Sequence, residues 1–179
     1  MTTAFCVDEL DRILFTKRDQ PQQVGIIAQT RDDAKDIFKD KLKFSFDNLH
    51  PYVRAYYKLV GDSADELAIS NGSTIRVGTS LRSSTLQRLH VTEFGKICAK
   101  YPEKAREIIT GSLNTVHTGQ EIVIESTAEG KEGYFYEMCQ KAKENAGKDL
   151  SPMDWKFFFF PWWKHPDYVL DSPCKLDEK

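Results

Sequence analysis

The sequence predicts an α/β fold with a mainly parallel sheet. Short apolar runs of strand type alternate along the chain with helical patterns of about 10–15 residues. That alternation is typical of parallel strands whose two faces are both covered by helices. In such sheets, ligands bind at the carboxyl ends of the strands. We therefore expect functional side chains where the strands end.

Length and composition indicate one soluble globular domain. The chain has 179 residues, of which 40% are hydrophobic, so it can bury a core without disulfides or metals. Its net charge of −2 comes from interleaved charges, which excludes a broad basic surface and an acidic disordered tail. No apolar run approaches the roughly 20 residues that span a bilayer, and the N-terminus lacks signal-peptide character.

The four cysteines are far apart in the sequence: Cys6, Cys98, Cys139 and Cys174. None forms a CxxC pair or a Cys/His pair at zinc-ligand spacing. We expect reduced thiols in an intracellular protein.

The first half of the chain predicts a helix, then a strand, then a second helix. Residues 1–15 place apolar side chains at helical spacing, so a helix begins almost at Met1. Residues 24–30 form an apolar run of strand type. Thr30 then begins "TRDD", an N-terminal cap pattern, and the apolar stripe of the second helix follows it. Its members are Ala34, Ile37, Phe38 and Leu42.

The middle of the chain predicts a hairpin, a strand and a helix. Asn71-Gly72-Ser73 lies between two apolar runs and predicts a β-hairpin at about 66–78. A polar loop at 79–85 leads into "LQRLHVTEFGKI", a strand that finishes at Thr92-Glu93. Pro102 then begins a helix that Gly111 ends.

The last third predicts two strands and one helix. "EIVIESTAEG" (121–130) is a buried strand that ends in small hydroxyl residues. Phe135, Met138, Cys139 and Ala142 mark the next helix, and "WKFFFFPWW" (155–163) is the last strand. We expect a folded domain over 1–168 and a loosely ordered tail over 169–179.

Two strand ends carry reactive groups. A carboxylate such as Glu93, at the tip of a buried strand, can act as a general base towards water or help to hold a divalent ion. It can also simply cap the next helix. Hydroxyls such as Ser126 and Thr127 can hydrogen-bond a phosphate, a water or a carboxylate, and they can also be an ordinary helix cap.

Four stretches together resemble the ATPase domain of the large subunit of tailed-phage terminases, the DNA-packaging motors. They are "GIIAQTRDDAKDIFKDKLKFSFDNL", "LQRLHVTEFGKI", "IVIESTAEG" and "FFFFPWWKHPDY". The resemblance runs from about residue 2 to about residue 168. It implies a three-layer P-loop ATPase core of the additional-strand, catalytic-glutamate class.

The resemblance assigns expected roles to particular residues. Glu93 ends the Walker B region and would activate water for ATP hydrolysis. Ser126, Thr127 and Ala128 match the coupling motif that links hydrolysis to DNA movement. Arg82 lies where the family often has an arginine near the phosphates, although it also fits a solvated loop arginine.

Two departures from the family pattern bear on activity. Walker B usually carries Asp-Glu, whereas this chain has Thr92-Glu93, and a hydroxyl can still hold a metal-bound water. No Walker A loop, G-x-x-x-x-G-K-[ST], occurs anywhere in the sequence. Met1 and the helix after it align with the end of that motif, so Thr2 or Thr3 would match its metal-binding hydroxyl. We therefore expect a chain truncated at both ends.

The resemblance implies a parent protein that uses ATP and Mg²⁺ to drive double-stranded DNA into a procapsid. Its expected partners are a portal protein and a small terminase subunit, in the cytoplasm of the bacterial host. For this chain we expect little or no ATPase activity, because the phosphate cradle is missing. The alternative is a non-catalytic prophage remnant or interaction module without ATP binding. A helicase-like ATPase is disfavoured by the "FFFFPWWKHPDY" ending.

Two further features of the sequence bear on function. The aromatic run at 155–163 fits a base-stacking platform or, better, core packing on both faces of a strand. Trp162, Trp163 and Tyr168 would then lie near the boundary to an absent nuclease domain, where exposure would promote self-association. The four histidines have no ligand spacing and receive no role.

Overall fold

The structure is a computed structural model that describes residues 1–17, 19–61, 63–82 and 85–168. The predicted loose tail, 169–179, and Cys174 within it lie outside the described residues. The chain divides into two compact units, Met1–Glu137 and Met138–Lys179. The described cysteines, Cys6, Cys98 and Cys139, are free. Within the described residues, no helix is long and apolar enough to cross a bilayer.

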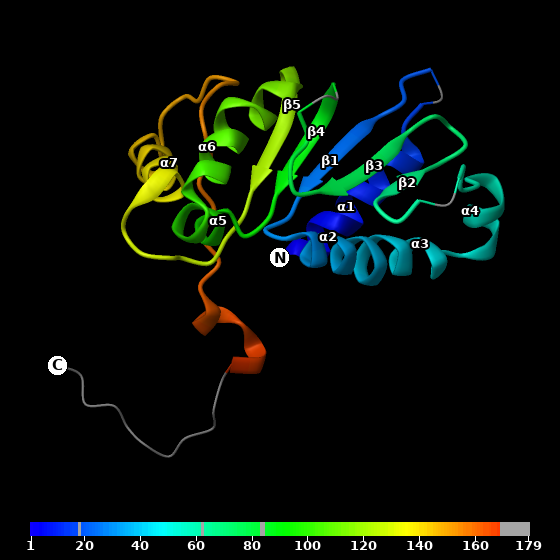
Figure 1. Cartoon of the computed structure of the whole chain (residues 1–179), viewed down its shortest axis with the longest axis horizontal. Coiled ribbons are helices and arrows are strands. Elements are labelled where there is room, and N and C mark those ends of the chain that lie inside the picture. Colours follow the sequence, from blue (N-terminus) through cyan, green and yellow to red (C-terminus); the bar gives the residue numbers. More distant parts are fainter. Residues whose placement is uncertain (18, 62, 83–84, 169–179) are drawn as a thin grey trace. The chain divides into compact units, whose positions relative to one another are not determined.

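The first unit is built on one five-stranded sheet (Figure 1). Its strands are β1 (Gln23–Ile27), β2 (Glu66–Ala68), β3 (Thr74–Gly78), β4 (Leu86–Val91) and β5 (Val116–Ile124). Their order in the sheet is β2-β3-β1-β4-β5. All neighbours pair in parallel except β2 and β3, which form an antiparallel hairpin. The predicted α/β fold with a mainly parallel sheet is confirmed.

Helices and short helical turns connect the strands and follow them. Their bounds are α1 (Thr2–Phe15), α2 (Arg31–Asp36), the π-helix Ile37–Lys43, α3 (Phe44–Asp47), α4 (Pro51–Tyr56), α5 (Phe94–Lys100), α6 (Pro102–Thr110), the 3₁₀ turn Ser112–Thr115, α7 (Gly133–Glu144) and the 3₁₀ turns Trp162–Lys164 and Pro166–Tyr168. The helices α2 and α3 and the π-helix between them follow one another without a break.

Helix α1 packs on one face of the sheet and runs from the carboxyl ends of the parallel strands towards their amino ends. The apolar side chains that the sequence placed at helical spacing, Cys6, Leu10, Ile13 and Leu14, are all buried. Near its C-terminus, the Ile13 carbonyl accepts a hydrogen bond of 2.7 Å from Asn71, in the hairpin turn just before β3. Because that turn lies at the amino end of β3, the N-terminus of α1 lies near the carboxyl ends of the parallel strands.

The first strand and the second helix form as predicted, with one boundary difference. Thr30 and Asp33 form a complete capping box at the start of α2. The predicted apolar stripe, Ala34, Ile37, Phe38 and Leu42, is buried. Strand β1 ends at Ile27 rather than at residue 30, because its partners in β3 and β4, Gly78 and Val91, are the last residues of those strands.

Both faces of the parallel sheet are covered. Arg88 and His90 contact α1, through ion pairs and an aromatic contact respectively. Side chains alternate along a strand, so the fully buried Leu89 and Val91 face the other side, where α5 and α6 bury Phe94, Ile97, Ala105 and Ile108. The hairpin at 66–78 is confirmed, with Gly72 at the positive φ of 89° that its turn requires.

The predicted last strand is wrong. Residues 155–160 do not belong to a strand, and the side chains of Phe158, Phe159 and Phe160 are 63–65% exposed. Core packing on both faces of a strand is therefore also wrong for these residues. A strand requires a neighbour that accepts its backbone hydrogen bonds, and within the described residues the sheet ends at β5.

The buried strand predicted at 121–130 has different bounds and lies at the edge of the sheet, where Ile122, Val123 and Ile124 are only half-buried. It begins at Val116 and ends at Ile124, so Ser126 and Thr127 lie in the irregular segment beyond it. Helix α5, which begins directly after Glu93, was not predicted from the sequence.

Candidate functional site

The carboxyl edge of the sheet brings together the ends of β4 and β5 and the start of α1. The sheet hydrogen bonds continue one residue past each strand. The Thr92 N–H donates to the Ile27 carbonyl at 2.9 Å, and the Glu125 N–H donates to the Val91 carbonyl at 3.0 Å. Thr92 and Glu125 are therefore held by the sheet itself.

Glu93 follows at the tip of β4 in a left-handed conformation, with φ 51° and ψ 36°. Among the described residues it is the only non-glycine with positive φ. It occupies the N-cap position of α5, but its side chain makes no cap hydrogen bond. Its carboxylate instead lies 2.8 Å from Lys96 Nζ, and this hydrogen bond raises the pKa of Lys96. The simple helix-cap interpretation of the side chain is not what the structure shows.

The segment after β5 touches the start of α5 at Gly95. The Gly95 N–H donates to the Ser126 hydroxyl at 2.9 Å. A Cβ on residue 95 would lie 2.8 Å from Ser126 Oγ and 2.9 Å from the Thr127 carbonyl oxygen. Only glycine permits this approach. Ser126 and Thr127 therefore contact α5 at Gly95, two positions after Glu93 in the sequence. The structure thus brings Ser126 and Thr127 against the start of the helix that Glu93 precedes.

Glu125 connects β4, β5 and α1. Its Oε1 lies 3.2 Å from Nε2 of His90, which is fully buried, and its side chain also hydrogen-bonds Thr2. Burial alone would raise the pKa of Glu125, but the hydrogen bonds to His90 and Thr2 outweigh it and lower that pKa. Sequence reasoning missed both Glu125 and His90. Each lies close in the sequence to a residue that was predicted, but their contact depends on the pairing of β4 with β5.

The remaining predicted residues are placed as follows. Thr2 lies beside Glu125, whereas the Thr3 hydroxyl lies 3.4 Å from Lys41 Nζ. Thr92 is buried and Ala128 is exposed. Arg82 forms an ion pair of 2.7 Å with Glu107 on α6. This ion pair does not support the predicted role of Arg82 as an arginine near the phosphates, beside Glu93.

Lys104 was also missed by the sequence. From the first turn of α6, its Nζ donates to the carbonyls of Ala28 and Gln29, at 3.0 and 2.7 Å. Burial lowers the pKa of Lys104. These two carbonyls follow β1 directly, so Lys104 fastens α6 to the same edge of the sheet.

A charged cluster fixes α1 on the sheet. Arg88, only 5% exposed, pairs with Glu9 and Asp8 at 2.7 Å and with Glu121 at 3.2 Å. Glu9 is fully buried, and this burial raises its pKa from 4.5 to about 7, although Arg88 opposes the rise. Because Glu9 and Thr2 share α1, the cluster helps to set where the start of that helix lies.

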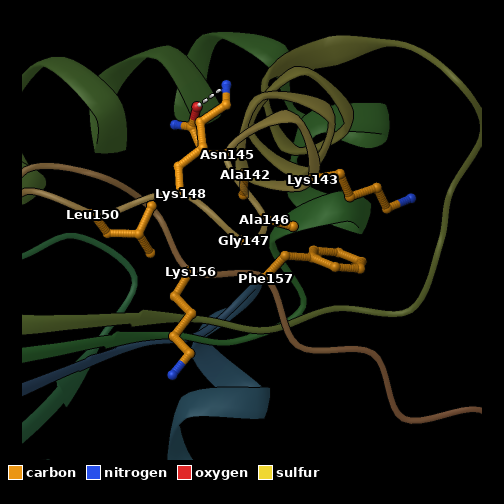
Figure 2. A pocket seen from close by; sticks show the side chains of 9 residues that line it. All are labelled: Ala142, Lys143, Asn145, Ala146, Gly147, Lys148, Leu150, Lys156 and Phe157. Carbon is orange, nitrogen blue, oxygen red and sulfur yellow. Dashed lines mark hydrogen bonds between the residues drawn. The ribbon is translucent and has the colours of Figure 1, made fainter.

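The second unit contains a cavity of about 450 Å³ near the end of α7 (Figure 2). Its lining includes Lys143, Lys148 and Lys156 beside Phe157. Figure 2 shows the three ammonium groups pointing away from one another. The cavity therefore does not concentrate positive charge on one point.

Within the described residues, no group of three or more His, Cys, Asp or Glu side chains is arranged to hold a metal ion. The oxygens at the carboxyl edge are nevertheless hard donors: the hydroxyls of Thr2 and Thr92 and the carboxylates of Glu93 and Glu125. Such donors suit Mg²⁺, which keeps several waters and takes one or two protein ligands together with substrate phosphates.

Comparisons with known proteins support the fold. No protein-family model matches the chain. No curated protein matches it either. Among solved structures, it is similar to the crystal structure of the HK97 bacteriophage large terminase, with a TM-score of 0.63 and 14% sequence identity. The match covers 82% of this chain and 31% of that one, so this chain spans about a third of the length of that terminase. The chain has a terminase-like fold.

Proposed function

We propose that the carboxyl edge of this sheet is the water-activating side of a terminase-type ATP site. One observation carries the proposal. Glu93 stands at the tip of a buried parallel strand in a strained left-handed conformation, next to the contact between Gly95 and Ser126. Backbone strain of this kind persists where the surroundings over-determine it, and it clusters at functional sites.

In this proposal Glu93 is the general base that orients and polarises the attacking water. A base must be held rigidly within hydrogen-bond reach of the water. The end of β4 supplies the rigidity, and Lys96 Nζ pairs with the carboxylate at 2.8 Å. A change of the bound nucleotide would move Ser126 and Thr127, and their contact with Gly95 would pass this movement to α5.

Thr2 and Thr92 would hold Mg²⁺, directly or through water. The ion, when bound with ATP, neutralises charge on the phosphates during transfer. The pairing of Arg82 with Glu107 gives no support for a role of Arg82 at those phosphates.

The likeness to a large terminase extends the proposal to the parent activity. We propose a protein that couples ATP hydrolysis to the packaging of double-stranded DNA, with a portal protein and a small terminase subunit as partners in the host cytoplasm. The support for this wider step is the fold together with the order of the sequence motifs.

A chimaera tests the proposal directly. The 179 residues contain no phosphate-binding loop of the G-x-x-x-x-G-K-[ST] type, so the chain alone is expected to hydrolyse ATP at background rate. A strand with such a loop, taken from a P-loop ATPase, is joined ahead of Thr2. The folded chimaera is expected to gain Mg²⁺-dependent ATPase activity that Glu93→Gln reduces by at least 10²-fold.

Two controls make the result decisive. Glu129→Gln changes an exposed carboxylate in the segment after β5 and is expected to leave the rate unchanged. Circular dichroism and thermal melting check that each variant is folded. A folded chimaera that binds ATP but hydrolyses it equally well with Gln at position 93 would rule out the role of Glu93.

A non-catalytic interaction module is the second candidate, and the exposed aromatic side chains of the second unit favour it. This candidate predicts no saturable ATP binding by the chimaera, since none of its edge residues would be arranged for a nucleotide. Isothermal titration with a non-hydrolysable ATP analogue separates the two functions.

A further inference from the structure

The position where Walker B usually has an aspartate is Thr92, and a carboxylate lies directly beside it on the next strand. Strands β4 and β5 pair in parallel with Val91 opposite Ile124, and the Glu125 N–H continues this ladder to the Val91 carbonyl. Glu125 is therefore the register partner of Thr92. Paired residues of parallel strands point to the same face of the sheet. His90, two residues before Thr92, shares that face and contacts Glu125.

We propose that Glu125 supplies the carboxylate of a Mg²⁺ site. Thr92, which stands where an aspartate is usual, has no carboxylate to supply. This inference rests on the proposed ATP site and names a further residue within it. The start of α1 adds the third donor, because the Thr2 side chain hydrogen-bonds Glu125. One carboxylate and two hydroxyls then come from three neighbouring segments at the carboxyl end of the sheet.

The chemistry of these donors fits the ion. Mg²⁺ prefers oxygen ligands and is usually held by one or two carboxylates plus phosphate oxygens and water. The Glu125 side chain is 9% exposed and Thr92 is 2% exposed, so both are presented from rigid, largely buried positions. The Glu93 carboxylate already pairs with Lys96 Nζ at 2.8 Å, whereas Glu125 lies opposite Thr92 on the neighbouring strand.

His90 is a positioning residue for Glu125. With the proton on Nε2, its ring donates to Oε1 of Glu125 at 3.2 Å and fixes the orientation of the carboxylate. Its Nδ1 is buried without a hydrogen-bond partner in the part of the chain that the structure describes. Phe5 of α1 packs on the ring, with centroids 5.0 Å apart. The ring therefore has little freedom to turn away from Glu125.

Manganese binding tests the assignment without using activity. Mn²⁺ replaces Mg²⁺ at oxygen sites, and the loss of its free-ion electron paramagnetic resonance signal reports binding. The full chain is titrated with Mn²⁺ in the absence of nucleotide, because a nucleotide would itself bind Mn²⁺ and remove the free-ion signal. Glu125→Gln is expected to weaken Mn²⁺ binding at least tenfold, while the matched control Glu129→Gln stays within twofold.

A second variant restores the missing carboxylate on β4. In the double variant Glu125→Gln/Thr92→Asp, the new aspartate stands at the register position next to residue 125. It is expected to recover most of the lost affinity for Mn²⁺. A purely structural role of Glu125 would not produce this rescue, because the glutamine at residue 125 has the same contacts with His90 and Thr2 in the single and the double variant, and only the carboxylate at residue 92 is added.

The outcomes separate this inference from the proposed function. Unchanged Mn²⁺ affinity in folded Glu125→Gln overturns the inference and leaves the role of Glu93 standing. Loss of affinity without rescue by Thr92→Asp also overturns it, as does the absence of saturable Mn²⁺ binding in the unmodified chain. A chimaera without ATPase activity, together with Mn²⁺ binding that depends on Glu125, supports the metal site and contradicts the ATPase proposal.

Discussion

Glu93 combines a candidate catalytic carboxylate with a backbone conformation that its side chain disfavours. The left-handed region costs a non-glycine residue about 1 kcal/mol, and glycine occupies it freely. The hydrogen bond from the Thr92 N–H to the Ile27 carbonyl and the start of α5 hold the chain in this geometry from both sides. Stability and proposed function therefore oppose each other at this residue.

Glu93→Gly is expected to raise the free energy of unfolding by about 0.5–1 kcal/mol, because it removes the left-handed strain. Glu93→Ala is the matched control, since it also removes the carboxylate and its pair with Lys96 but keeps the Cβ. The difference between the two variants in urea unfolding isolates the backbone effect. Equal stabilities would show that the conformation at residue 93 is not strained.

Gly95 carries the second residue-scale prediction. Helix propensity alone favours alanine over glycine by about 1 kcal/mol. In this structure a Cβ at residue 95 would overlap Ser126 Oγ and the Thr127 carbonyl oxygen. Gly95→Ala is therefore expected to destabilise by about 1–3 kcal/mol, the usual cost of overpacking.

The sign of the change decides this prediction. Ala99→Gly, at an exposed position of the same helix, is the comparison, and it should cost about 1 kcal/mol through propensity alone. Chemical denaturation of both variants provides the measurement. A stabilised Gly95→Ala would mean that the segment after β5 does not lie against α5.

At the scale of elements, the attachment of α1 to the sheet depends on a buried carboxyl group. Burial raises the pKa of Glu9 from 4.5 to about 7, although Arg88 lies beside it. The folded-state pKa is above the unfolded one. The associated stability is therefore fully present below about pH 4.5 and is lost as the pH rises through about 7.

Glu9→Gln should remove most of this pH dependence, because the amide stays neutral. Between pH 5 and pH 8, the unmodified chain is expected to lose on the order of 2 kcal/mol more stability than the variant. Asp11→Asn, an exposed carboxylate on the same helix, is the control. Urea unfolding at several pH values checks the prediction, and parallel curves for the unmodified chain and Glu9→Gln would contradict it.

The elements that the sequence predicted well are those whose signals are local. The capping box at Thr30, the Asn71-Gly72 turn and the apolar stripe of α1 each depend on residues within a few positions of one another. The parallel sheet followed from the alternation of strands and helices. The run at 155–163 was mispredicted, because its apolar, aromatic composition favours a strand but only a neighbouring strand can make it one.

The candidate site was predicted only in part, for a related reason. Glu93, Ser126 and Thr127 were visible because they follow strands directly. Glu125 and His90 were missed, because their contact depends on the register between β4 and β5, which no single stretch of sequence reveals. The ion pair of Arg82 with Glu107 likewise joins segments that lie 25 positions apart in the sequence.

At the scale of the whole molecule, the second unit exposes a dense set of aromatic side chains. Phe158, Phe159, Phe160, Trp162, Trp163 and Tyr168 are each more than half exposed. Several of these rings contact one another, as Phe159 and Trp163 do with centroids 6.0 Å apart. A contiguous apolar patch of this kind is typical of an interaction surface.

Self-association through this patch is expected to depend on concentration. Phe159→Ser/Trp163→Ser should shift the sedimentation coefficient at micromolar concentrations towards that of a monomer. Tyr52→Ser is the control, because Tyr52 is an 82% exposed aromatic residue of the first unit. A chain that sediments as a monomer at all concentrations, or an equal effect of the control, would exclude the patch as the cause.

The hydrogen bond from the Gly95 amide to the Ser126 hydroxyl gives the protein an internal spectroscopic probe. This amide proton is protected from solvent exchange only while the segment after β5 stays against α5. Its exchange rate and chemical shift therefore follow the position of the proposed coupling segment without any added label. If nucleotide and metal move that segment, the resonance of one glycine will record the movement.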